Sequence, residues 1–232
     1  MKSEPRTGSS REPTTDRASH RADKDVGPRR RRYRQAARLE SAAATGRRII
    51  DAFVKLTRDV WFDELTLNDV AKHAGVSVQS VIRRFGGKDG LISAVIAEIG
   101  GEIGARRTAP PGDIKASFAA LLSVYEEHGD GVIRNLAQES RYPELKRIVE
   151  FGRQEHRRLT AETYAPWLDG LAPAAKREAL DALVIATDIY VWKLLRRDMG
   201  RSVAQTKTAM LRLINAVLVE HTGKLIREGE KK

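Results

Sequence analysis

The sequence predicts an all-α protein with two helical domains, and three observations support this. Residues 65–85 have the pattern of two short helices joined by a glycine turn. Apolar residues recur at helical spacing on either side of that segment. A cluster of glycines and prolines at residues 100–112 separates the two parts of the chain. With 232 residues, 41% of them hydrophobic, the chain is long enough for one or two modest cores.

Residues 65–85 predict helices at 67–74 and 78–85. Thr66 precedes the first apolar run, where a side-chain oxygen caps the free N–H groups of a helix start, and Ser77 has the same position before the second. Gly75 ends the first helix, because a residue without Cβ adopts the left-handed conformation at no steric cost. The two helices can share one core, with the small Ala71 facing the partner helix where they cross steeply.

From Gly46 to about Gly100 the chain resembles the DNA-binding domain of the TetR family of transcriptional regulators. The run A-K-H-A-G-V-S-V-Q-S-V-I-R-R-F-G-G-K-D-G-L, starting at Ala71, carries the resemblance. The positions that agree with the family pattern are Thr66, Val70, Ala71, Ala74, Gly75, Val76, Ser77, Val81, Phe85, Lys88 and Leu91. Four positions differ, with Ile82, Arg84, Thr57 and Trp61 in place of the family's tyrosine, histidine, phenylalanine and glycine. The spacing is unbroken, so the resemblance implies the family's three-helix fold.

Charge points to a polyanionic partner. The net charge is +11, and residues 1–48 hold 14 Lys and Arg against 6 Asp and Glu. The chain has no cysteine and no apolar run long enough for a membrane helix, which is compatible with a cytosolic protein. The resemblance to a family of DNA-binding regulators implies a cytoplasmic location in association with the bacterial nucleoid. No metal-ligand spacing, phosphate loop or catalytic triad is present, which predicts a protein that is not an enzyme and has no cofactor.

Residues 1–43 are expected to form a disordered basic arm, because they contain too few large apolar residues to offset the entropy of ordering. The alanines of 36–44 also allow the first helix to begin earlier. Within the arm, the arginines of 29–34 can lie along phosphates or in a minor groove, or serve only as a solubilising tail.

Residues 44–104 are expected to form the DNA-binding domain. Its helices are predicted at 47–59, 67–74, 78–85 and 88–100, and a domain boundary follows at the glycines and prolines of 100–112.

The outward side chains of helix 78–85 are the expected DNA readers. Gln79 and Arg83 suit adenine and guanine edges, with Val78 and Ser80 against thymine methyls or base edges. Arg84 equally suits a phosphate, and Ile82 offers an apolar contact in place of the family's tyrosine. The expected contacts to the DNA backbone are made by Thr66, Lys72, Ser77 and Lys88, and, as the resemblance implies, by Arg47 and Arg48.

Residues 113–228 predict a second helical domain. Its helices are expected at 113–127, 132–140, 143–164, 174–197 and 203–221. Gly129-Asp130-Gly131 is predicted to be a turn, and Pro166 and Gly170 are predicted to interrupt the chain after 164.

The resemblance implies a homodimer through the last two helices, and their wide apolar faces agree with this. Two recognition helices one DNA turn apart would then read a palindromic operator. The resemblance also implies a ligand pocket, and its candidate polar side chains are Tyr125, His128, Gln138, Tyr142, His156, Tyr164 and Trp192.

The function predicted from the sequence is that of a DNA-binding transcriptional regulator, a repressor released from a palindromic operator by a small molecule. One alternative is a DNA-binding protein without a ligand, either a constitutive repressor or an architectural protein. The other is a small-molecule-binding or enzymatic helical protein whose helix-turn-helix is vestigial.

Overall fold

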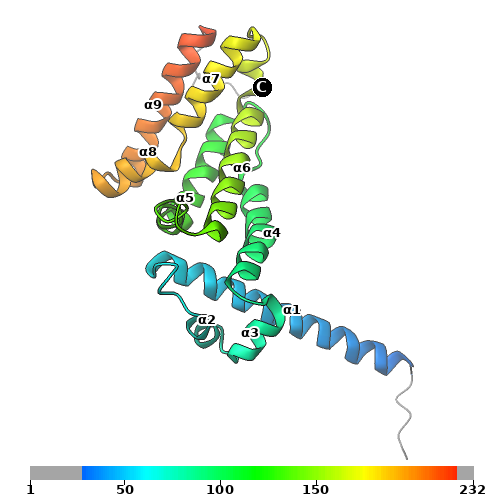
Figure 1. Ribbon diagram of the computed structural model, residues 1–232. Helices are drawn as coiled ribbons and strands as arrows, with labels where there is room; N and C mark the ends of the chain where they lie inside the picture. The colour runs from blue at the N-terminus through cyan, green and yellow to red at the C-terminus, as the bar shows by residue number, and fades with distance from the viewer. Residues whose placement is uncertain (1–27, 224–232) are drawn as a thin grey trace, which may run out of the picture. The chain divides into compact units, whose positions relative to one another are not determined.

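The computed structural model describes residues 28–223, and within that range it is helical without strands (Figure 1). The elements are α1 (Pro28–Asp59), α2 (Leu67–Ala74), α3 (Val78–Phe85), α4 (Lys88–Arg107), α5 (Ile114–Leu136), α6 (Pro143–Leu168), α7 (Pro173–Ala186), α8 (Ile189–Lys193), the π-helical segment η1 (Leu194–Asp198) and α9 (Val203–Thr222). In the described part of the chain, no helix is both long and apolar enough to cross a membrane. The all-α prediction is confirmed.

Helices α2 and α3 have the predicted bounds, and their ends are the predicted ones. Thr66 accepts a bond from the backbone N–H of Asp69, whose carboxylate accepts one in return from the N–H of Thr66. Gly75 is left-handed, with φ of 65°, and sends the chain into the second helix. Ser77 accepts from the N–H of Ser80 at 3.2 Å.

One buried cluster holds α1, α2, α3 and the first half of α4 together. Ile49, Ile50, Val70, Val81 and Leu91 at its centre are fully buried. Leu145 of α6 belongs to the same cluster, so the helix-turn-helix core also includes a residue from the C-terminal half. A second cluster joins α5 to the C-terminal helices, with Trp192, Leu183, Met210 and Ile214 at its centre.

The first helix is longer than predicted. A helix over 47–59, preceded by a disordered arm through residue 43, was expected, but α1 begins at Pro28. The prediction of disorder is therefore wrong for residues 28–43. Proline suits the first helical position, and alanine has the highest helix propensity. The rest of the arm, residues 1–27, and residues 224–232 lie outside the described residues.

Glycines misled the prediction of two helix ends. The predicted helix 88–100 continues through the glycines of 100–104 to Arg107, and the predicted turn at 129–131 lies inside α5. Gly100 and Gly129 serve close packing. A Cβ on Gly100 would come within 2.6 Å of the Phe151 ring, and one on Gly129 within 2.5 Å of the Trp192 ring. The end of α5 at Leu136 also means that a separate helix at 132–140 was wrong.

The predicted long helix 174–197 is broken at Thr187 and Asp188, and this prediction was also wrong. Thr187 donates its hydroxyl to Leu183 O, and Asp188 caps α8 by accepting from the N–H of Tyr190. Both side chains bond to nearby backbone and so compete with a continuous helix. In contrast, Pro166 does not interrupt the chain, because it lies in the last turn of α6, which ends at Leu168.

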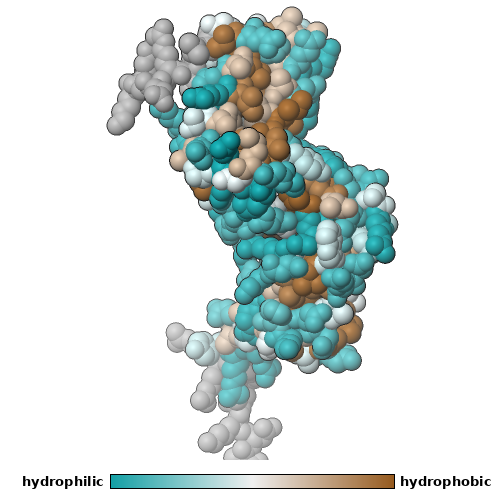
Figure 2. Space-filling view, turned by 90° about the vertical axis from the view of Figure 1, so that its left-hand side faces the viewer, coloured by the Kyte–Doolittle hydropathy of each residue, from teal (hydrophilic) through white to brown (hydrophobic). Residues whose placement is uncertain are grey.

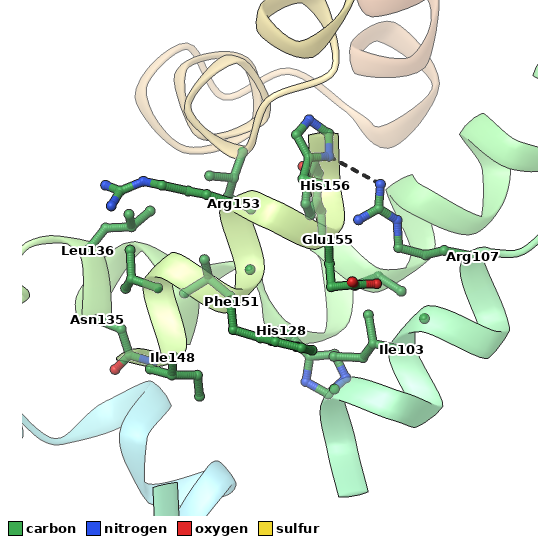
Figure 3. Close-up of a pocket in the computed structure, with 18 of the residues that line it drawn as sticks. Ile103, Arg107, His128, Asn135, Leu136, Ile148, Phe151, Arg153, Glu155 and His156 are labelled. Atoms are coloured by element: carbon green, nitrogen blue, oxygen red, sulfur yellow. Dashed lines mark hydrogen bonds between the residues drawn. The ribbon is translucent and has the colours of Figure 1, made fainter. Parts of the chain in front are cut away.

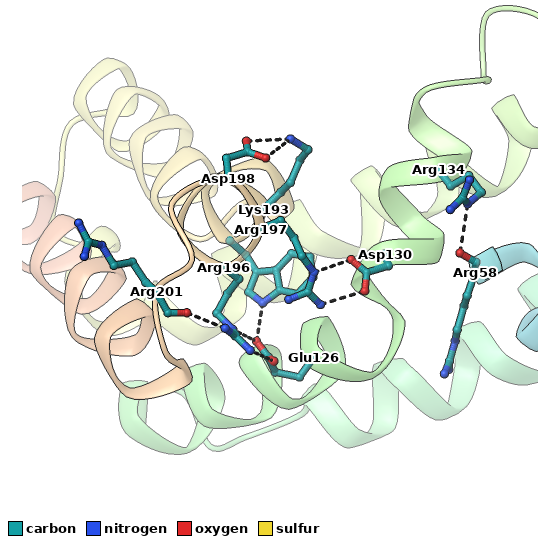
Figure 4. Close-up of polar contacts among 10 residues, drawn as sticks. Arg58, Glu126, Asp130, Arg134, Lys193, Arg196, Arg197, Asp198 and Arg201 are labelled. Carbon is teal, nitrogen blue, oxygen red and sulfur yellow. Dashed lines mark hydrogen bonds and ion pairs between the residues drawn. The ribbon is translucent and has the colours of Figure 1, made fainter.

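Charged contacts hold α8 and η1 against α5 (Figure 4). Glu126 of α5 accepts from Arg196 through both carboxylate oxygens and from Trp192 Nε1, each at 2.8 Å. One turn further along, Asp130 accepts from Arg197 at 2.7 and 2.9 Å. The π-helical turn thereby presents successive arginines to successive turns of α5.

Two helical glycines provide a matched test of this packing. Gly129→Ala should lower the free energy of unfolding by about 1–2 kcal/mol, because the new methyl group meets the buried Trp192 ring. Gly101→Ala should raise it by up to about 1 kcal/mol, because a Cβ there meets nothing within 4 Å and alanine favours the helix. Urea unfolding at equal protein concentration measures both, and equal effects of the two changes would contradict the packing role of Gly129.

Candidate DNA interface and ligand cavity

The outer face of α3 carries side chains that are free to contact another molecule. Gln79, Ile82 and Arg83 are all exposed, and Ile82 retains 40% of its accessible surface. Gln79 and Arg83 make no hydrogen bond or ion pair with any described residue. Their donors and acceptors therefore remain available to a base edge, as the sequence predicted.

The other predicted contacts of α3 are partly used within the protein. Val78 is half-buried against the core, and the Ser80 hydroxyl lies 2.9 Å from the Ser77 hydroxyl. The guanidinium of Arg84 lies over Gly46 of α1, where a Cβ would come within 2.4 Å of it, and 5.8 Å from the Phe85 ring centre. Arg84 is exposed, but it rests against α1.

Some of the residues predicted to contact the DNA backbone are also free, and others are used within the protein. Lys72 and Arg48 are exposed and make no hydrogen bond or ion pair with a described residue. Arg47 instead pairs with Asp51 and with Glu102 of α4. Lys88 donates to Phe62 O at 2.5 Å and lies 4.6 Å above the Phe62 ring, and burial lowers the pKa of its amine. Lys88 therefore fastens α4 to the link between α1 and α2.

A cavity of about 260 Å³ lies among α4, α5 and α6, with the ends of α7 and α8 closing one side (Figure 3). Its wall is mainly apolar, formed by residues such as Val95, Ile99, Ile103, Val149 and Leu159. The volume is just below the range of about 300–1,000 Å³ that is usual for small-molecule sites.

Three of the seven predicted ligand-binding side chains line this cavity, namely Tyr125, His128 and His156. The Tyr125 hydroxyl donates to Thr187 O at 3.0 Å, and burial raises the pKa of this phenol. Since its one proton is already donated, Tyr125 offers a ligand mainly its ring.

The other four predicted side chains do not line the cavity. Gln138 accepts from the N–H of Phe62 at 3.0 Å and donates to Arg134 O at 3.0 Å. Tyr142 packs against Phe62 in a tilted arrangement, with ring centres 5.2 Å apart. Tyr164 and Trp192 belong to the second buried cluster. The sequence identified these groups as candidate polar side chains of a pocket but did not reveal their partners.

Sequence reasoning missed the charged lining of the cavity, which consists of Arg107, Arg153, Glu155 and Asp188. Arg107 stands four residues after Ile103 on the same face of α4. A helix extended through the glycines would have placed it beside the apolar wall. The predicted end of that helix at residue 100 hid this signal.

Each cavity histidine accepts a hydrogen bond from an arginine. Arg107 Nη2 lies 3.1 Å from His156 Nδ1, and Arg58 Nη2 lies 3.0 Å from His128 Nδ1. An arginine only donates, so each Nδ1 is unprotonated and each ring is neutral with its proton on Nε2. Burial, with the nearby Arg107 charge, lowers the pKa of His156 to about 4, and burial likewise lowers that of His128.

Within residues 28–223, no three His, Asp or Glu residues are grouped as a metal ion would require.

Comparisons with solved structures agree with the fold. Two solved structures share the fold at 17% identity and a TM-score of 0.60: a candidate transcriptional regulator from Pseudomonas aeruginosa PAO1 and a transcriptional regulator from Rhodococcus sp. Rha1. The matches cover 76% and 75% of this chain, and 91% and 96% of the respective structures. No curated relative matches.

Residues 49–95 match the family described as bacterial regulatory proteins, tetR family. The matched range runs from the first core residue of α1 to Val95 of α4, and so contains the helix-turn-helix with its capping box and glycine turn. Over residues 49–95 the chain therefore has a helix-turn-helix of the type found in the DNA-binding domain of TetR-family regulators.

Proposed function

We propose that the protein is a repressor that releases its operator when a small molecule enters the cavity among α4, α5 and α6. One observation carries this proposal. Val95 and Ile99 of α4 belong both to the buried cluster around the helix-turn-helix and to the cavity wall. A ligand that displaces these side chains must also change the packing beneath α2 and α3, because close-packed cores transmit small shifts.

Contacts from α5 offer a second connection between cavity and DNA-binding domain. Arg134 Nε donates to Arg58 O at 3.1 Å, at the end of α1 (Figure 4), and its guanidinium lies 4.7 Å from the Trp61 ring centre. Gln138 holds the N–H of Phe62. Helix α5, through Arg134, and the turn that follows it, through Gln138, thereby contact the link from α1 to α2, so movement of α5 would alter the position of α2.

A homodimer through α7 and α9 is part of the proposal. Figure 2 shows hydrophobic surface on the upper part of the molecule, which the C-terminal helices form. Ile185 is 65% exposed and Leu213 45% exposed on α7 and α9, two helices that pack against each other. Exposed apolar side chains of this size favour burial in an interface. Two copies related by a twofold axis would present two α3 helices to a palindrome.

Two observations argue against the alternative functions. A regulator without a ligand would be favoured by a fully packed second domain, and the cavity does not fit that expectation. The helix-turn-helix keeps intact helix caps and two exposed, unpaired side chains, Gln79 and Arg83, that suit base edges. Both features favour a working DNA-binding unit over a vestigial one.

Arg83→Ala should lower the ratio of operator affinity to random-DNA affinity about 10-fold or more, because a bidentate contact to guanine would be lost. Selection from random DNA first gives the operator, and fluorescence anisotropy at near-physiological salt then measures both affinities.

Lys72→Ala should weaken binding to all sequences alike and reduce the salt dependence by about one counter-ion.

Lys115→Ala is the matched control, because this exposed lysine on α5 makes no side-chain hydrogen bond or ion pair with a described residue and lies outside the helix-turn-helix. Equal loss of discrimination in Lys115→Ala and Arg83→Ala would contradict the assignment of α3 as the DNA reader.

Ile103→Trp should lower operator affinity about fivefold or more, because an indole at this wall position fills part of the cavity as a ligand would. Ala105→Trp, an exposed position on the same helix, should leave operator affinity unchanged. Circular dichroism verifies folding of both variants. An increase in operator affinity for Ile103→Trp would show that filling the cavity favours DNA binding, contrary to release.

The double change Ile185→Glu with Leu213→Glu should convert the dimer to a monomer, because four buried carboxylates per twofold interface would lack partners. Sedimentation equilibrium gives the mass. Leu39→Glu on α1, also a 65% exposed apolar position, should leave the dimer intact. A dimer that persists in the double variant would exclude this interface.

A further inference from the structure

Arg107 is the unneutralised charge of the cavity wall. Its only polar contact with a described residue is the 3.1 Å hydrogen bond to the neutral ring of His156, shown dashed in Figure 3. No carboxylate among residues 28–223 forms an ion pair with it. Burial lowers the pKa of the guanidinium, yet arginine stays protonated in proteins. The wall therefore holds a positive charge that is partly desolvated and unmatched.

The other charged groups of the wall already have partners. Arg153 donates to both oxygens of Glu139, at 2.7 and 2.6 Å. Glu155 attracts Arg107 from a distance, but its carboxylate is bound by Arg158 at 2.7 Å. Asp188 caps α8, and burial raises the pKa of its carboxyl group. Arg58 lines an adjoining, smaller cavity of about 100 Å³, which shares His128 with the main cavity, and its guanidinium donates to that ring.

This arrangement of charges favours a ligand with a negative charge. A cation would meet Arg107 without gaining a free carboxylate, whereas an anion would supply the missing counter-charge. Pairing a partly buried charge recovers much of its desolvation cost. A guanidinium presents its N–H groups as a planar fork that fits the two oxygens of a carboxylate. A phosphate monoester would bring a charge of about −1.5 to −2 against one unmatched positive charge, so the carboxylate fits better.

The rest of the wall selects the body of the ligand. Ile99, Ile103, Val149 and Leu159 surround the cavity, and its histidines are neutral with their ring nitrogens bonded to neighbouring groups. An apolar body gains from leaving water here, while a body with many hydroxyl groups would find few free partners.

Building on the proposed function, we propose that the effector is an amphipathic organic acid, with one carboxylate bound by Arg107 and an apolar body in the cavity. Arg107 is then a specificity-determining residue of the regulator. His156 positions it, because the hydrogen bond to Nδ1 holds the guanidinium against α6.

Three probes with one tail and different heads test the sign of the charge. Decanoate, decylamine and decanol are titrated into the full-length protein by calorimetry, below their micelle concentrations, and decyl phosphate is added as a fourth probe. Hexanoate to dodecanoate extend the range of tail lengths. Decanoate or a neighbour in the acid series should bind at least about tenfold more tightly than the amine or alcohol of equal length.

Substitutions test the assignment to Arg107. Arg107→Gln should weaken binding of the acid about 10- to 100-fold, and Arg107→Lys should retain part of it. Arg106, the preceding residue, pairs with Glu127 outside the cavity, so Arg106→Gln should not change acid binding. Arg153→Gln removes a wall charge that is already neutralised, so its effect should be smaller than that of Arg107→Gln. Thermal unfolding without ligand verifies that each variant is folded.

The outcomes separate this inference from the proposed function. It is overturned if no acid of the series binds more tightly than its amine or alcohol, if decyl phosphate binds more tightly than decanoate, or if folded Arg107→Gln binds the acid as wild type does. Operator release is measured in parallel by anisotropy. If the acid binds through Arg107 without releasing DNA, the inference stands and the repressor proposal fails. If the amine or alcohol releases DNA from Arg107→Gln as well as from wild type, the inference about Arg107 fails and the repressor proposal stands.

Discussion

The packing of α4 is the constraint on which the rest of the structure depends. Its first half supplies Leu91, Ile92 and Val95 to the core beneath α2 and α3, and its second half lines the cavity. A single rigid helix therefore belongs to both halves of the protein, and Lys88 and Arg47 tie it to the α1–α2 segment. Any change in the cavity that moves α4 must be accommodated by the helix-turn-helix core.

Local signals in the sequence predicted the local structure well. The bounds and caps of α2 and α3 followed from Thr66, Gly75 and Ser77, because a cap satisfies N–H groups only a few residues away. Glycines were misread where their role is tertiary. Gly129 accommodates the Trp192 ring, 63 positions later in the sequence, and nothing near Gly129 indicates that neighbour. The break at Thr187 was missed because both side chains that cause it also occur within helices.

The difference between local and tertiary signals also explains why the sequence predicted the cavity lining only in part. Aromatic and histidine side chains could be recognised as polar groups in an apolar domain, but Gln138 and Trp192 have partners 76 and 66 residues away. The sequence prediction ended the helix at residue 100 and so left Arg107 outside it. The significance of Arg107 depends on its lack of an ion pair with any carboxylate of residues 28–223, which only the folded arrangement of α4 and α6 reveals.

The exposed face of α3 also has a consequence for how such a protein diversifies. Gln79 and Arg83 make no contact on which the fold depends, so replacing them changes stability little. The cavity wall lies on other helices, and Arg107 is 24 positions further along the chain than Arg83. For the repressor that we propose, preference for DNA sequence and preference for ligand could therefore change separately through single substitutions, while helix α4 would preserve the link between the two sites.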